Sequence, residues 1–321
     1  SFAQKTLSSL NQTLRYSRYS RISLKIIPVK ESETSFKLQF QVEKIEENPE
    51  FNLYSFTYSI LDSYDQEILS DNTNILTSDD LKYDTDRHWV FEKSIEIPNT
   101  TETAIALFTA LDTRQGDEYY YSTDIKSGFV FDLPNFGAYY ANNVGFDQNY
   151  LTAGESLLFK SNGGPNLQGD FLANVPKSFD EIGYYFVQSD TSSRTGIVLK
   201  TTHEAFPKVK DWDEMVDMVT YISTRKEHEA LLAAEDKKKA LDTYWIGLTR
   251  NEDTSKELIR EYFRQVEFAN ILFTDFKEGW KTDRGMIYIV MGPPEEVNFY
   301  LDREVWSYGG TNESSRIRFT F

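Results

Sequence analysis

The feature that most constrains the fold is a change in the spacing of apolar residues near Pro207. Before it, apolar and polar residues alternate, as in 36–42 and 54–60, and a period of two predicts β-strands. After it, apolar residues in 212–222 recur with a period of about 3.6, which predicts an amphipathic helix. We therefore expect a multidomain protein that is mainly β and ends in an α/β domain.

The β part holds enough candidate strands for two domains. The first group is 22–29, 36–42, 54–60, 88–97, 104–111 and 118–125, separated by polar loops such as 70–80. Six strands over about 110 residues are typical of an immunoglobulin-like β-sandwich, which we place at 21–128. A second β-rich domain is expected at 129–207, with strands at 155–160, 183–188 and 196–200. Residues 1–20 have few periodic apolar positions and are expected to form an N-terminal tether or a short peripheral helix.

The C-terminal part, 208–321, is expected to contain three helices and a short sheet. Charged and apolar residues predict a second helix at 226–245 and a third at 255–273. The apolar stripe of the third helix is Leu258, Ile259, Tyr262, Val266, Ala269 and Phe273. The apolar run 286–291 is short and bounded by glycine and proline, so we interpret it as a buried strand. A Pro-initiated helical turn is expected to follow at 295–300.

Composition excludes several classes of function. The 51 acidic and 34 basic residues give a formal net charge of −17, which repels nucleic acid and anionic lipid surfaces. Cysteine is absent, so disulfides, thiolate metal sites and cysteine nucleophiles are excluded. No run approaches the ~18 consecutive apolar residues of a membrane span. A nucleic-acid-binding protein is therefore not expected.

Glycine and proline are concentrated after the third helix. The group consists of Gly279, Trp280, Lys281, Thr282, Asp283, Arg284 and Gly285, followed by Gly292, Pro293 and Pro294. Thr282 or Asp283 could accept backbone N–H bonds in a tight turn between helix and strand. Arg284 could pair with a carboxylate or cap helix carbonyls, and glycine supplies dihedral angles that other residues avoid. A structural turn explains every residue of the motif.

This motif resembles the signature of the GWxTD-domain proteins, a family of bacterial envelope proteins. The aromatic pair Tyr244-Trp245, the helix at 262–273, the aromatic strand at 305–308 and the segment 316–321 are also similar to family elements. The resemblance covers roughly 211–321. Two departures indicate a divergent branch: Gln265 stands where the family often has Arg, and 250–254 lacks a common Asp-Pro sequence.

The resemblance implies a cellular location and a role. Proteins of this family resemble lipid-anchored or secreted envelope proteins of Bacteroidota, and no catalytic residues are established for them. We expect a non-enzymatic accessory subunit of an outer-membrane assembly for protein export, insertion or gliding. It would be an outer-membrane lipoprotein facing the periplasm or the cell surface, anchored just before Ser1, with other envelope proteins as partners and without a cofactor.

Some residues also allow a ligand-binding interpretation. Asp283 and Arg284 could form a ligand-binding pair in a pocket floored by Trp280, although the turn is favoured. The segment after 291 resembles a phosphate loop only in part, because prolines remove the N–H groups that such a loop needs. A carbohydrate or peptidoglycan binding module could use exposed tyrosines as stacking platforms. The candidates are Tyr119, Tyr120, Tyr121, Tyr139 and Tyr140.

Metal and hydrolytic sites have weaker support. The histidines lack a second His or a Cys at ligand spacing, so a zinc site is not expected; they are His88, His203 and His228. A loop with four aspartates has the charge of a calcium loop but lacks its Gly and terminal Glu; these are Asp79, Asp80, Asp84 and Asp86. A carboxylate-dependent hydrolase would need two carboxylates flanking the scissile bond, and acidic residues are too abundant here for a pair to be chosen.

Overall fold

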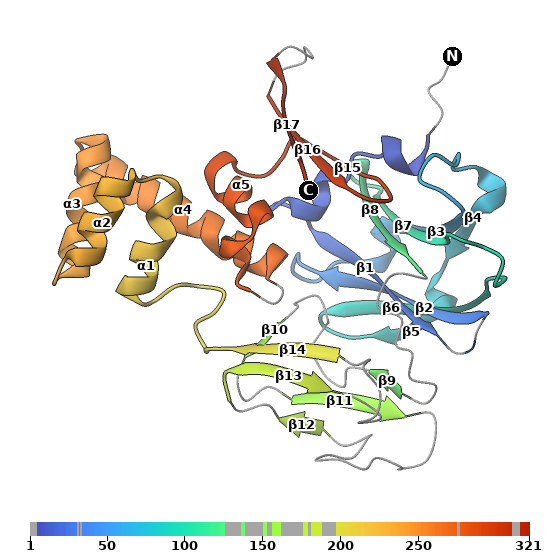
Figure 1. The fold of residues 1–321 in the computed structure, drawn as a ribbon. Helices are drawn as coiled ribbons and strands as arrows, with labels where there is room; N and C mark the ends of the chain where they lie inside the picture. The colour runs from blue at the N-terminus through green and yellow to red at the C-terminus, as the bar shows by residue number, and fades with distance from the viewer. Residues whose placement is uncertain are drawn as a thin grey trace.

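The computed structural model describes residues 5–30, 32, 34–125, 136–138, 150–152, 156–161, 176–178, 181–187, 197–274, 277–309 and 315–321. Antiparallel sheets form the N-terminal part, and helices with a small sheet form the C-terminal part (Figure 1). The expected order, mainly β and then α/β, is confirmed at this level. Of the helices in these ranges, none is long and apolar enough to cross a membrane.

Two four-stranded antiparallel sheets make up the first part of the chain. One has the order β1 (Ile22–Lys30), β2 (Ser35–Lys44), β6 (His88–Glu96), β5 (Leu81–Asp84). The other has the order β4 (Thr73–Leu76), β3 (Tyr54–Leu61), β7 (Ile105–Asp112), β8 (Asp117–Asp124). All six predicted strands are present. The prediction of a plain loop at 70–80 is wrong, because β4 pairs with β3 there.

The inward side chains of these sheets form one core. Phe40 on β2 lies 5.2 Å from Phe108 on β7, and Phe56 on β3 lies 5.5 Å from Phe91 on β6, measured between ring centroids. Both pairs join one sheet to the other at distances that are favourable for aromatic side chains. The alternation in the sequence therefore marks the faces that meet in this core.

Residues 5–20, which we call the strap, do not form a free tether. Two short 3₁₀ helices, η1 (Leu7–Ser9) and η2 (Thr13–Tyr16), shape the segment. Leu7 and Leu10 are buried with side chains of β3, β7 and β8, whereas Tyr16 is buried in the C-terminal core. The tether interpretation is wrong because three buried apolar side chains are too few to show a periodic pattern, whereas the expectation of a short helix agrees with η1 and η2.

The region that follows β8 is described only as short strands. They are β9 (Phe136–Ala138), β10 (Tyr150–Thr152), β11 (Ser156–Ser161), β12 (Pro176–Ser178), β13 (Gly183–Val187) and β14 (Ile197–Thr202). They form two three-stranded sheets, with orders β12-β11-β9 and β10-β14-β13. Strands β11, β13 and β14 correspond to the three that the sequence predicts, and the rest of 129–207 lies outside the described residues.

Helices dominate the C-terminal part (Figure 1). They are α1 (Trp212–Met218), α2 (Arg225–Ala233), α3 (Lys237–Thr249), α4 (Glu252–Phe273) and α5 (Asp283–Met291), with turns η6 (Val219–Tyr221) and η7 (Gly279–Lys281). A three-stranded antiparallel sheet follows, in the order β15 (Glu296–Phe299), β16 (Glu304–Tyr308), β17 (Ile317–Thr320). On α4 the predicted stripe packs inward except Leu258, which is 41% exposed.

The single helix predicted at 226–245 is two helices. Ala234, between them, has an extended backbone. The Asp236 side chain accepts a 2.9 Å hydrogen bond from the Lys239 backbone N–H and so caps the start of α3. Capping satisfies a backbone donor that the first turn of a helix leaves unpaired. The sequence did not reveal the break between α2 and α3, because charged residues continue through both helices and the segment between them.

Two further secondary-structure predictions are wrong. The run 286–291 is the body of helix α5 rather than a strand, and 295–300 contains strand β15 rather than a helical turn. An apolar run this short fits a strand or a buried helix equally well. The flanking residues decide: Thr282 caps the start of α5, and Gly292 ends it with a φ of 81°.

Candidate functional site

The motif turn, residues 278–285, contains two close contacts between backbone segments, at Gly279 and at Gly285. A Cβ added to Gly279 would lie 1.9 Å from the carbonyl oxygen of Ala269 on α4. A Cβ added to Gly285 would lie 1.9 Å from the carbonyl oxygen of Gly279. Neither glycine has a positive φ, so the expectation of unusual dihedral angles is wrong. Close approach is what requires glycine at both positions.

Thr282 and Asp283 start helix α5. Thr282 Oγ1 accepts a 2.9 Å hydrogen bond from the Gly285 N–H and donates one of 2.7 Å to the Gly279 carbonyl. The predicted role of a short polar side chain in the turn is thus confirmed for Thr282, although the turn joins α4 to a helix instead of a strand. Asp283 is exposed in the first turn of α5, where a carboxylate is favoured by the helix dipole.

Trp280 is buried, and its backbone is held at both ends. Its N–H donates to Asn270 Oδ1 at 3.1 Å, and its carbonyl accepts a 2.8 Å bond from the Tyr221 hydroxyl. The Asn270 side chain also donates to the Pro207 carbonyl at 3.1 Å. Asn270 therefore connects the chain that enters the helices with the motif turn. This role of Asn270 was not predicted from the sequence.

Arg284 connects the turn to the small sheet. Its Nε donates to Glu304 Oε2 at 2.8 Å, and the other oxygen of the buried Glu304 accepts a 2.6 Å bond from Trp306 Nε1. The predicted pairing of Arg284 with a carboxylate is confirmed. The alternative, a ligand-binding pair of Asp283 and Arg284 over Trp280, has no support here. Arg284 bonds to Glu304, and Trp280 is a core residue.

Glu278 joins the turn to strand β14. It accepts hydrogen bonds from Lys200 Nζ at 2.9 Å and forms an ion pair with Lys281 at 2.8 Å. Burial acts to raise the pKa of Glu278, but the bonds from Lys281 and Lys200 outweigh it and lower the pKa to about 2. The side chain is therefore a carboxylate at neutral pH. An ionised group committed to two lysines is a structural element and is poorly suited to proton transfer.

Gly292, Pro293 and Pro294 lead from α5 into β15. The Gly292 N–H donates to the Tyr288 carbonyl, and the Gly292 carbonyl accepts a 2.9 Å bond from the Tyr308 hydroxyl. This end of α5 is the C-terminus, where the helix dipole is negative and disfavours an anion. The segment is thus the exit of a helix into a strand, not the predicted exit of a strand into a helical turn, and its geometry opposes a phosphate loop.

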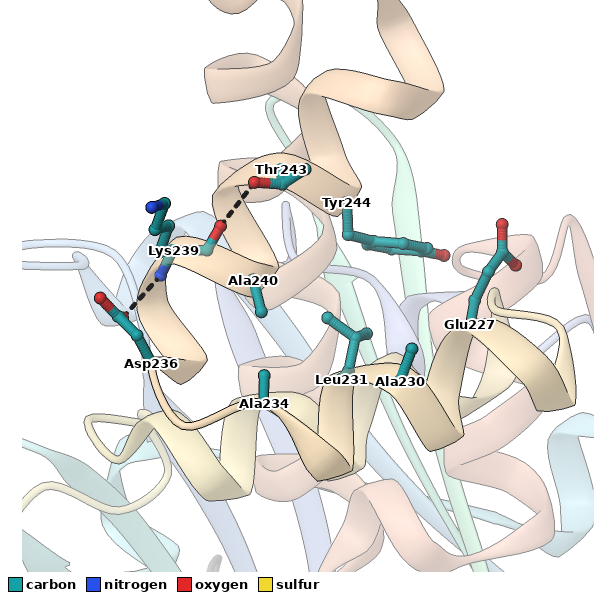
Figure 2. A pocket seen from close by; sticks show the side chains of 9 residues that line it. All are labelled: Glu227, Ala230, Leu231, Ala234, Asp236, Lys239, Ala240, Thr243 and Tyr244. Atoms are coloured by element: carbon teal, nitrogen blue, oxygen red, sulfur yellow. Dashed lines mark hydrogen bonds between the residues drawn. The ribbon is translucent and has the colours of Figure 1, made fainter.

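An open groove lies between α2 and α3 (Figure 2). It encloses ≈ 460 Å³ and is lined mainly by small or apolar side chains such as Ala230, Leu231 and Ala240. The acidic residues at its ends are used in capping: Asp236 binds the Lys239 N–H, and Glu227 accepts a 2.8 Å bond from the Thr224 N–H. This groove can accommodate apolar groups but brings no free pair of reactive side chains together.

His203, His228 and Asp80 have structural partners. His203 Nδ1 accepts a bond from the Phe206 N–H, and His228 Nε2 lies 3.1 Å from the Val216 carbonyl oxygen. Asp80 accepts a bond of 2.8 Å from the Thr77 N–H and pairs with a lysine. Within the described ranges, no group of three or more His, Cys, Asp or Glu residues could hold a metal ion.

The tyrosines proposed as stacking platforms are not an exposed surface. Tyr119 and Tyr120 are buried. The ring of Tyr121 is partly buried and lies 4.1 Å from the guanidinium carbon of Arg15. Tyr139 and Tyr140 lie outside the described residues. The described members of this set therefore give no support to a carbohydrate-binding platform.

The geometry defines a small α/β module whose signature turn is a packing element. Comparison with protein families matches residues 183–321 to the GWxTD domain. The C-terminal part of this chain is therefore a GWxTD domain, as the motif indicated. The match begins at 183 and so includes β13 and β14, ahead of the start predicted at 208, in agreement with the bond from Lys200 to Glu278. Searches of curated proteins and of solved structures returned no match.

Proposed function

We propose that the protein is a non-catalytic structural or accessory subunit of an outer-membrane protein assembly of the export, insertion or gliding type. The observation that carries the proposal is the use of the signature residues. Gly279 and Gly285 permit backbone contact, Trp280 fills the core, Thr282 caps α5 and Arg284 binds Glu304. Because the signature residues are used for internal packing, they support a structural role for the domain, in which its surface contacts other proteins.

The strap supports the same role, because it ties the two halves together. Its Leu7 and Leu10 pack against the sandwich, and its Tyr16 packs in the GWxTD core. A segment that contributes to two cores restricts the motion of one relative to the other. Such a body can hold partner proteins at a fixed spacing, which suits an accessory subunit. We further assign the first part, residues 21–128, to the immunoglobulin-like type of sandwich, a type often used for interaction surfaces.

We also propose that the chain is a lipoprotein at the outer membrane, facing the periplasm or the cell surface. This proposal extends the family resemblance and does not depend on the fold. One acyl chain gives only marginal membrane binding, so stable retention would need further acyl chains or protein partners. Intact-mass measurement of the native protein tests it: added lipid mass supports the anchor, and an unmodified N-terminus contradicts it.

Cross-linking mass spectrometry of the tagged full chain, expressed at its native level, tests the assembly role. The proposal predicts reproducible cross-links to outer-membrane proteins and elution at a mass well above that of the monomer. A Trp280→Ala chain should form fewer of these cross-links because its GWxTD domain is destabilised. Elution as a free monomer under every membrane-solubilising condition, without cross-links to other envelope proteins, would contradict the proposal.

A further inference from the structure

The strap differs in charge from the rest of the chain. Residues 5–20 contain three basic residues, Lys5, Arg15 and Arg18, and no acidic residue, in a protein of formal net charge −17. Lys5 pairs with Glu118 on β8 at 3.0 Å, and Arg18 pairs with Glu261 on α4 at 2.7 Å. The strap is thus a basic segment bound to an acidic body, and charge complementarity favours this contact.

The strap occupies the free edge of the small sheet. Strand β15 is the edge strand of that sheet. The Gln12 N–H donates to the Val297 carbonyl at 2.8 Å, and the Val297 N–H donates to Asn11 Oδ1 at 3.0 Å. The Asn11 side chain also donates to the Glu295 carbonyl at 3.3 Å. The strap therefore satisfies edge groups that an added strand would otherwise bind, as in peptide recognition by edge strands.

A single aromatic anchor fixes the strap in the GWxTD core. The Tyr16 ring lies 5.2 Å from the Trp306 ring and 5.4 Å from the Phe273 ring, between centroids. The Tyr16 backbone carbonyl accepts a 2.9 Å bond from the Tyr288 hydroxyl. One buried aromatic side chain in a pocket, with hydrogen bonds to the adjacent backbone, is the usual form of a peptide hot spot.

Arg15 completes the contact between the two halves of the protein. Its guanidinium carbon lies 4.1 Å from the Tyr121 ring centroid on β8 and 4.8 Å from the Phe299 ring centroid on β15. A cation between two aromatic rings is attracted by both. The sandwich and the GWxTD domain therefore each supply one wall of this part of the strap site.

The strap also has a feature that weakens its binding. The Gln12 side chain is 1% exposed, and within the described residues neither its oxygen nor its nitrogen has a hydrogen-bond partner. Burial of an unpaired amide is unfavourable. The strap is held by Tyr16 in the GWxTD core, by Leu7 and Leu10 against the sandwich, and by its hydrogen bonds and charges, and the buried amide of Gln12 opposes this binding. Release of the part between Asn11 and Tyr16 would relieve the unpaired amide and free the β15 edge for a competitor.

We propose that the GWxTD domain and strand β8 form a receptor for a basic, extended peptide with a tyrosine anchor, and that the strap is its built-in, displaceable occupant. A partner segment of the same chemistry would compete for the β15 edge and for the Tyr16 pocket. The inference does not depend on the role in an outer-membrane assembly, because it concerns the purified chain alone.

The test uses the full chain and a fluorescent synthetic peptide of residues 5–20. Asn11→Ala loosens the strap without removing a core side chain, and hydrogen exchange of the strap amides verifies the loosening. Fluorescence anisotropy should show at least about tenfold tighter peptide binding to the Asn11→Ala chain than to the unchanged chain, because its site is free more often. Binding should weaken as salt is added.

Peptide variants show whether the anchor matters. A Tyr16→Ala peptide should lose binding, whereas a Tyr19→Ala peptide should bind like the unchanged one, because Tyr19 is 76% exposed. The Tyr16→Ala chain serves as a second loosened receptor. Equal binding of the Tyr16→Ala and unchanged peptides would overturn the proposal. Absence of peptide binding to both loosened chains, with the exchange protection of β16 retained, would also overturn it.

Discussion

The sandwich and the GWxTD domain are stabilised in different ways. In the sandwich, large side chains from both sheets meet in many pairs, such as Phe40 with Phe108 and Phe56 with Phe91. The GWxTD domain also has an aromatic core, with Phe273 against Tyr288 and Trp306, but its motif turn depends in addition on backbone contacts at Gly279 and Gly285 and on the buried amide of Asn270. The first arrangement spreads the stabilising free energy over many residues. The motif turn adds a few positions, Gly279, Gly285 and Asn270, that should tolerate little change.

Trp280→Ala should have the largest effect, with a loss of about 3 to 5 kcal/mol in the unfolding free energy of the GWxTD domain. Trp280 is buried beside Tyr221, so its removal leaves a cavity in the core. Trp212→Ala is the matched control, because Trp212 is 44% exposed. Thermal unfolding of both variants provides the measurement. Unchanged unfolding of Trp280→Ala together with lost partner binding would make Trp280 an interface residue.

Gly279→Ala should cost about 3 kcal/mol, at the upper end of the range for overpacking, because a rigid backbone faces the new methyl group. Gly247→Ala, in the interior of α3, is the control. A Cβ there meets nothing within 4 Å, so this variant should gain up to about 1 kcal/mol from helix propensity. Chemical denaturation measures both. Equal effects of the two substitutions would refute the close-packing account.

Asn270→Ala should cost about 2 kcal/mol, because it leaves the Trp280 N–H and the Pro207 carbonyl without their partner. The loss should appear in the unfolding transition of the GWxTD domain and leave that of the sandwich unchanged. Asn74→Ala on β4 is a matched control, since Asn74 is exposed. A loss of the same size in both variants would show that the hydrogen bonds of Asn270 to Trp280 and Pro207 add no particular stability.

Acid should lower the free energy of unfolding of both the sandwich and the GWxTD domain, through a different carboxylate in each. Hydrogen bonds from Arg114 and Arg21 lower the pKa of Asp112 in the sandwich to about 2, and the pKa of Glu278 is also about 2. Because each folded-state pKa lies below the ordinary value, the contribution is complete above about pH 4.5 and is lost as the pH falls toward 2. Glu278→Gln should flatten this pH dependence only in the GWxTD domain, as followed by denaturation at each pH. An unaltered pH profile would contradict the role of the two lysines.

The sandwich strands could be predicted from the sequence because apolar residues line one face of strands such as β2 and β3 and polar residues the other. Alternation at 36–42 and 54–60 gives the strands and the buried side chains together, since the side-chain period of a strand is two. In the motif, the glycines and short polar side chains predicted the turn, and a carboxylate partner was one of two roles predicted for Arg284. The type of element after it was not predictable, because the apolar run at 286–291 fits both helix and strand.

Contacts between segments that are far apart in the chain could not be predicted from the sequence. Nothing near Tyr16 shows that it packs against Trp306, and nothing near Gly279 shows that Ala269 lies against it. Such contacts depend on tertiary geometry, whereas periodicity reports only on local structure. For this reason the strap was predicted to be a tether or a peripheral helix, although its buried side chains lie in two different cores.

Hydrogen exchange of the unchanged chain and of Gly279→Ala, read segment by segment, tests the central claim most directly. If the signature turn is a packing element, Gly279→Ala should remove protection from α4, α5 and β16, and leave β2, β3 and β7 as protected as before. Protection that stays the same in α4 and α5, while partner binding is lost, would contradict the account and make the turn a binding surface.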